Sequence, residues 1–158
     1  MNASQQEDFL LRQVAAVGAA LARILGLRRG GAADEARAAL DHAYGLLLGT
    51  RSDLLRTIDV ASAAALVDAP DAILALAQLS AEEAEQDDDA DRRAALRVRA
   101  AALAIEALLR DEAHRDAREF LAGIAPAVDP RAFTHDQRVF VSELDRLGRR
   151  GERPPRRQ

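Results

Sequence analysis

The sequence predicts an all-α protein with about six to seven helices in one domain. Roughly a quarter of the chain is alanine and leucine comes next, and both are strong helix formers. Glycine and β-branched residues, which weaken helices, are sparse. Apolar residues recur at spacings of three and four along most of the chain, as in helices with one buried face. We expect the domain to span residues 1–148, followed by a disordered Arg/Pro-rich tail over residues 149–158.

The first helix is expected over residues 5–27. Its start matches a capping box, with Ser4 as the cap and Glu7 three residues later. Phe9 and Leu11 widen an apolar stripe whose members are spaced by four and three residues. The stripe consists of Leu10, Val14, Val17, Leu21 and Ile24. Such a near-heptad seam is buried either by neighbouring helices or by a partner.

The second helix is expected over residues 33–48. Asp34 and Glu35 lie in its first turn, where acidic side chains favour the helix dipole, and Gly49 ends it. Its apolar face consists of Ala36, Leu40, Ala43, Tyr44 and Leu47.

Six further helical segments follow along the chain. They are expected over residues 52–56, 59–67, 71–85, 91–110, 115–124 and 130–147. Leu109 is assigned to the apolar face of the fourth of these segments, and the last is expected to start at Pro130, because proline favours the first helical turn.

Two helical pairs match the packing pattern of tetratricopeptide hairpins. These hairpins place small residues around a bulky one at A-x3-F-x2-A spacing, where two helices nearly touch. Three sets fit, the last loosely: Ala36, Leu40 and Ala43; Ala94, Val98 and Ala101; Ala117, Leu121 and Ile124. We therefore predict irregular tetratricopeptide-like hairpins that pair the first helix with the second, and 71–85 with 91–110. Because the intervals depart from the repeat length of about 34 residues, an ordinary helical bundle is the alternative.

The segment "LARILGLRRGGAADEARAALDHAYGLLLG" resembles a small bacterial family of tetratricopeptide-like proteins of unknown function. The resemblance covers roughly residues 5–125. It implies an all-helical fold and a bacterial source. It does not imply an activity, and no functional residue can be transferred from it.

The chain lacks residues that several classes of enzyme require for catalysis. All 22 basic residues are arginine, so a P-loop lysine and a Schiff-base lysine are excluded. Cysteine is absent, which excludes thiol nucleophiles and thiolate metal sites. No G-x-S-x-G or Glu-x-x-His motif occurs, and His42 and His114 are expected to be surface residues. His135 lies near the start of the last helix and is uninformative. We expect no enzyme, and no catalytic, cofactor-binding or metal-binding residue.

Charge is unevenly distributed along the chain. The net charge of the chain is −4. Residues 146–158 carry a charge of +5, so the remaining residues together carry −9. The densest acidic stretch, residues 82–91, lacks EF-hand spacing. It is interpreted as a solvated turn whose last acids favour the following helix, rather than as a cation site. Because the acidic body repels polyanions, we do not expect a nucleic-acid partner.

Neither a signal peptide nor a membrane-spanning segment is expected. The first residues contain no basic region before an apolar stretch, and no charge-free apolar run reaches the roughly 18 residues of a membrane span. We expect a cytoplasmic protein with no small-molecule substrate.

The sequence therefore predicts a protein-protein interaction module that is not catalytic. The predicted partner-binding residues lie on the first helix: Phe9, Leu10, Val14, Val17 and Leu21. The alternative is a self-associating structural protein that dimerises through the same stripe.

Overall fold

A computed structural model describes residues 2–151 of the chain. All regular structure in this range is helical, which confirms the all-α prediction. The described α-helices are α1 (Ala3–Arg29), α2 (Ala33–Leu48), α3 (Ser52–Thr57), α4 (Val60–Val67), α5 (Pro70–Gln86), α6 (Ala90–Arg110), α7 (Arg115–Ile124) and α8 (His135–Gly151). Three short 3-10 helices join some of them: η1 (Gly49–Arg51), η2 (Ala125–Ala127) and η3 (Pro130–Ala132).

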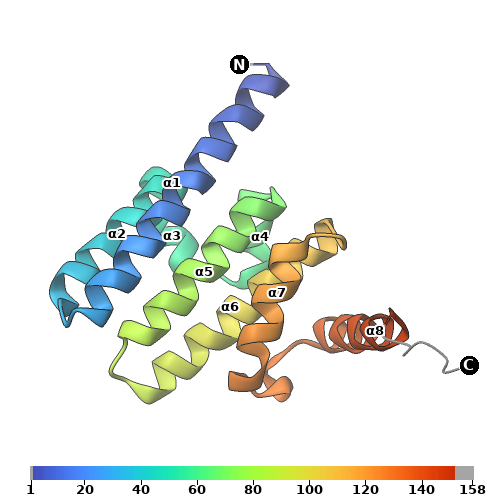
Figure 1. The fold of residues 1–158 in the computed structure, drawn as a ribbon. Helices are drawn as coiled ribbons and strands as arrows, with labels where there is room; N and C mark the ends of the chain where they lie inside the picture. Colours follow the sequence, from blue (N-terminus) through green and yellow to red (C-terminus); the bar gives the residue numbers. More distant parts are fainter. Residues whose placement is uncertain (1, 152–158) are drawn as a thin grey trace, which may run out of the picture.

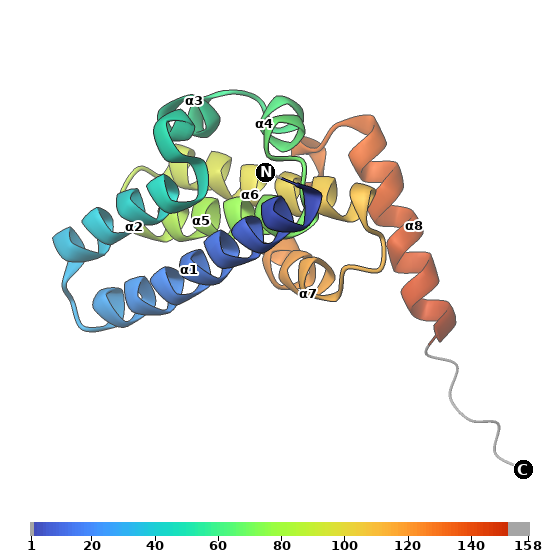
Figure 2. The ribbon, with the colours of Figure 1, turned by 90° about the horizontal axis from the view of Figure 1, so that it is seen from above.

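Two antiparallel hairpins form the body of the protein, α1 with α2 and α5 with α6 (Figure 1). Both pairs were predicted. The hairpins lie side by side because α1 and α2 both pack on α5, while α4 and α7 pack on α6. Viewed from above, α8 lies at the edge of this assembly, where it contacts α6 (Figure 2).

The core is centred on α5 and α6, which contribute more buried residues than the other helices. The buried residues of α5 are Ala72, Ile73, Leu74, Ala75, Leu76, Ala77, Leu79, Ser80 and Ala84. Four alanines in this set leave room for neighbouring helices to approach closely on several sides. On α6, Leu103, Ile105 and Leu108 are buried as expected. Leu109 is exposed, so its assignment to the apolar face was wrong.

The start of α1 differs from the prediction. Asn2 caps the helix: its Oδ1 accepts a hydrogen bond from Gln5 N at 3.0 Å, and Asn2 N donates to Gln5 Oε1 at 3.2 Å. The capping box therefore begins two residues before Ser4. Asparagine and glutamine supply the same acceptors as serine and glutamate, so two overlapping boxes compete in this segment.

The last helix also begins later than predicted. Pro130 opens the 3-10 turn η3, and α8 starts at His135 after a reciprocal pair of hydrogen bonds between Thr134 and Gln137. The helix continues to Gly151, beyond the predicted domain boundary at residue 148. Residues 152–158 of the predicted disordered tail lie outside the described residues.

Candidate functional site

The apolar stripe of α1 faces the protein's own core. Val17 is 0% exposed, and Leu10, Val14 and Leu21 are half-buried against the same core. A partner cannot contact Val17 in this arrangement, so the structure corrects its selection as a partner-binding residue. Phe9, the fifth selected residue, is 53% exposed.

The N-terminal part of α1 extends past the end of α2 (Figures 1 and 2). Gln13 Nε2 donates to Leu46 O at 3.3 Å, so the end of α2 lies beside Gln13 and residues 3–12 reach beyond it. Phe9 and Leu11 lie on this projecting part, and Leu11 is 51% exposed. Their apolar surface is therefore in contact with water.

Much of α1 is both apolar and exposed. An 18-residue window in this helix has a mean hydropathy of 1.5 and at most two charged residues, and 11% of the window is buried. Among the described helices, α1 alone has the length and composition to cross a membrane. The sequence-based search missed this window because it required a run without charges.

A groove of about 530 Å³ runs between α1 and α2 on the outer side of the hairpin. Four alanines form most of it, with two charged residues, a histidine and a leucine along them. The lining residues are Ala19, Ala20, Arg23, Glu35, Ala38, Ala39, His42 and Leu46. We refer to it as the α1–α2 groove. It has no counterpart in the sequence-based prediction, since those alanines lie outside the predicted apolar stripe.

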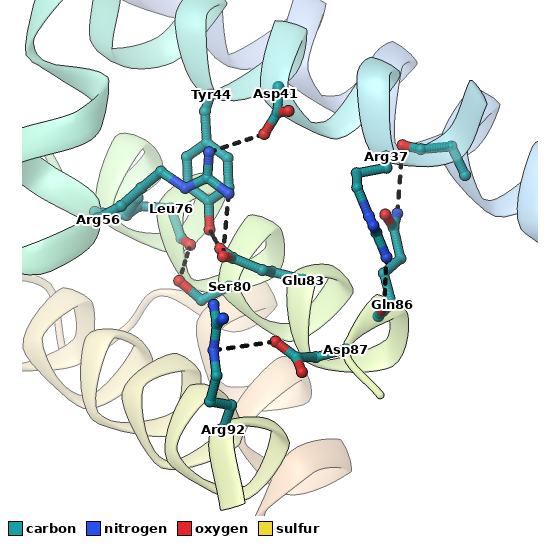
Figure 3. Close-up of polar contacts among 11 residues, drawn as sticks. Arg37, Asp41, Tyr44, Arg56, Leu76, Ser80, Glu83, Gln86, Asp87 and Arg92 are labelled. Atoms are coloured by element: carbon teal, nitrogen blue, oxygen red, sulfur yellow. Dashed lines mark hydrogen bonds and ion pairs between the residues drawn. The ribbon is translucent and has the colours of Figure 1, made fainter. Parts of the chain in front are cut away.

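A second feature is a polar junction, which we define as Asp41, Tyr44, Arg56 and Glu83 (Figure 3). Tyr44 Oη donates to Glu83 Oε2 at 2.7 Å. Arg56 donates to Asp41 Oδ1 at 2.9 Å and pairs with Glu83 Oε1 at 3.0 Å. The guanidinium of Arg56 also lies over the Tyr44 ring, 4.1 Å from its centroid. The junction thereby ties α2, α3 and α5 together.

The electrostatics of the junction keep Tyr44 protonated. Burial raises the pKa of the Tyr44 hydroxyl above its ordinary value, and the negative charge of Glu83 raises this pKa further. Burial by itself would lower the pKa of Arg56, but hydrogen bonds to the carboxylates of Asp41 and Glu83 outweigh it and the pKa is raised. A neutral phenol and a permanently charged guanidinium suit a structural contact between helices.

A cleft of about 480 Å³ opens beside the polar junction. Arg92 pairs with Asp87 at 3.3 Å across it, and Gln86 Nε2 donates to the carbonyl of Ala36 at 3.4 Å (Figure 3). Arg37 in turn donates to the carbonyl of Gln86. The two contacts of Gln86 fasten the end of α5 to α2 of the other hairpin, whereas the Asp87–Arg92 pair lies within the α5–α6 hairpin. Most charges that line the cleft are compensated by a neighbour.

The acidic stretch over residues 82–91 is only partly a solvated turn. The interpretation was wrong for its first residues, which lie on a packed helix. Glu82 lies on α5, is largely covered, and pairs with Arg28 of α1 at 2.8 Å. Glu83 belongs to the polar junction. The second half follows the prediction, because Asp89 caps α6 by accepting from the backbone of Asp91 and Arg92. Residues 2–151 hold no group of three or more histidine, aspartate and glutamate side chains placed to bind a metal ion.

His114 is not the surface residue that was expected, since only 10% of its side chain is exposed. It caps α7, with Nδ1 accepting from Ala117 N at 3.3 Å, and its Nε2 lies 2.8 Å from Asp71 Oδ1 on α5. Because Nδ1 accepts, the ring proton sits on Nε2 and is donated to Asp71. His42 is exposed, as predicted, and His135 is exposed as well.

No protein-family model, curated protein or solved structure matches this chain. The resemblance to a tetratricopeptide-like family therefore stays a prediction. Within the first set of predicted packing residues, Ala36, Leu40 and Ala43 are all buried in the hairpin. In the second set, Ala94 is exposed.

Sequence reasoning missed the polar junction entirely. Its residues belong to separate helices, and the bond between Tyr44 and Glu83 spans 39 positions of the chain. One signal was available: Glu82 and Glu83 fall inside a segment with strong helical periodicity, so they had to lie on a packed helix rather than in a turn.

Proposed function

We propose that this protein is a non-catalytic interaction module built on tetratricopeptide-like helix pairs. The observation that supports this proposal is the projecting N-terminal part of α1, where Phe9 and Leu11 are half exposed beyond the end of α2. Large apolar side chains gathered on one projecting element are typical of binding surfaces, because their contact with water is unfavourable until a partner covers them.

The experiment compares two double variants, each of which replaces two exposed apolar residues by serine. The double variant Phe9→Ser/Leu11→Ser removes the apolar side chains of the projecting part. The matched control Leu54→Ser/Leu66→Ser removes two leucines of similar exposure on α3 and α4. Each purified variant is immobilised, incubated with extract of the source organism, and its captured proteins are quantified by mass spectrometry.

The proposal expects the wild type and the control to recover the same proteins, and the α1 variant to lose them. It fails if no protein is enriched over bare resin, or if both double variants recover the same set as the wild type. Circular dichroism of each variant ensures that a loss of binding does not reflect a loss of helical structure.

A second candidate, a self-associating structural protein, is favoured by the apolar surface that α1 leaves uncovered. Only 11% of its 18-residue apolar window is buried, and Phe9 and Leu11 are half exposed. A second copy that covers this surface would remove it from water. Because the stripe of α1 is buried internally, such an interface has to use the exposed flanks of α1.

A further inference from the structure

We infer that the partner of the projecting part of α1 is a second copy of this chain, with Phe9 of each copy seated in the α1–α2 groove of the other. This inference rests on the proposed interaction function and names the partner of the side of the projecting part that carries Phe9.

Phe9 and the groove lie on the same side of α1. Phe9, Ala16 and Ala20 are spaced by seven and four residues, which places their side chains in one row along the helix. Ala20 lines the groove, and Gln13 of the same row touches the end of α2. One face of the hairpin therefore carries both a protruding aromatic ring and an alanine-lined hollow.

Phe9 cannot fill the groove of its own chain. Eleven residues separate it from Ala20, which is about 16 Å along a rigid helix. A second copy in antiparallel orientation brings the two together, with the two-fold axis passing between Val14 and Ala15. The same contact then forms twice, which closes the assembly as a dimer rather than a filament.

The groove suits an aromatic side chain. Its alanine lining admits a large ring without displacing other side chains, and aromatic residues are common anchors of interfaces. The antiparallel pairing also brings Asp8 of one copy within one helical turn of Arg23 on the rim of the other groove. Both side chains are exposed, and neither forms an ion pair in the described part of the chain. Opposite charges thus meet at both ends of the interface.

The test is the mass of the full chain in solution, measured by light scattering after size exclusion over a concentration series. The wild type is expected to be a dimer at micromolar concentration. Phe9→Ala is expected to weaken the dimer roughly tenfold or more, because the anchor is lost. Ala38→Arg fills the groove from an exposed position with a good helix former, and it is expected to have the same effect.

Leu11→Ala is the matched control. Leu11 is as exposed as Phe9 but points about 200° away around α1, so its loss should leave the dimer unchanged. The charge reversal Arg23→Glu should weaken the dimer, and Asp8→Arg added to it should restore the wild-type mass.

Three results would overturn the inference. The first is a monomer up to millimolar concentration. The second is an equal weakening by Leu11→Ala and Phe9→Ala. The third is binding of the wild type to neutral phosphatidylcholine vesicles that is lost with Phe9→Ala, which would assign the ring to a lipid surface. A monomeric wild type whose captured proteins are still lost with Phe9→Ser/Leu11→Ser would reject the dimer and leave the interaction function standing.

Discussion

Two helices of similar composition, α1 and α5, differ sharply in how much of them is covered. Of the 17 residues of α5, nine are buried, whereas in the 27 residues of α1 only Val17 and Ile24 are. Helix α5 is surrounded by α1, α2, α4 and α6, while α1 packs on one side against α2 and α5. Position in the assembly, rather than apolar content, decides burial, and this leaves the apolar end of α1 uncovered.

The largest expected effect on stability comes from a comparison of two residues within α1. Val17→Glu places an unpaired charge in the core and is expected to destabilise the protein by about 3–5 kcal/mol. Leu11→Glu places the same charge on the projecting part and should change stability by less than about 0.5 kcal/mol. Urea unfolding followed by circular dichroism measures both. Equal destabilisation by the two variants would mean that the projecting part of α1 is packed as tightly as its core side.

The next effect compares the two helices directly. Leu76→Ala in α5 opens a cavity at a fully buried position and is expected to cost about 2–5 kcal/mol. Leu10→Ala in α1 removes the same atoms from a half-buried position and should cost about 1 kcal/mol. Urea titration measures the free energy of unfolding of both variants. Equal values within experimental error would contradict the difference in burial between α1 and α5.

A smaller effect concerns the contact that joins the two hairpins. Tyr44→Phe removes the hydroxyl bonded to Glu83 and is expected to cost about 1 kcal/mol at neutral pH. Glu83 keeps its bond to Arg56 in this variant, which limits the loss. The free energy of unfolding in urea at pH 7 gives the value, and no change at all would mean that the hydroxyl contributes nothing to the docking of α2 on α5.

The same residue makes stability depend on alkaline pH. Since the pKa of Tyr44 is raised in the folded protein, its contribution is complete below the unfolded pKa of about 10 and is lost as pH rises above it. The chain has no lysine or cysteine, so Tyr44 is its one side chain that titrates between the histidines and the arginines. Wild-type stability should fall above pH 10 by up to about 1.4 kcal/mol per pH unit, and Tyr44→Phe should stay flat over the same range.

An effect of similar size is expected beyond α5, at the cap of α7. His114→Ala removes both the cap and the bond to Asp71 and is expected to cost about 1 kcal/mol. His114→Asn keeps a capping oxygen and should cost less. Hydrogen exchange of the first turn of α7 separates the variants, because only the alanine variant should exchange faster there. Identical exchange in the two variants would assign the loss to the contact with Asp71.

Local patterns predicted most of the fold. Helical periodicity placed α2 and α7 at their observed bounds, and both hairpins were paired correctly. Alanine spacing marks the buried contact in the first hairpin, where Ala36 and Ala43 are buried, but not throughout the second, where Ala94 is exposed. The start of α8 was also within reach, since Thr134-x-x-Gln137 matches a capping-box pattern that outweighs the proline before it.

The candidate site was less accessible to sequence reasoning. Phe9 and Val17 both qualify as apolar residues of α1, but Phe9 lies beside the stripe and beyond the end of α2, where it is exposed, whereas Val17 lies on the stripe and is buried. The polar junction depends on three helices meeting at one point, which no local spacing encodes.

The polar junction also gives the protein an optical signal of its own. Tyr44 is the single tyrosine of the chain and tryptophan is absent, so fluorescence excited in the tyrosine absorption band, beyond that of phenylalanine, arises from this ring alone. A phenol that donates to a carboxylate is quenched, and separation of α2 from α5 should therefore brighten the emission. Unlabelled protein can report the opening of its own hairpin interface in a stopped-flow experiment.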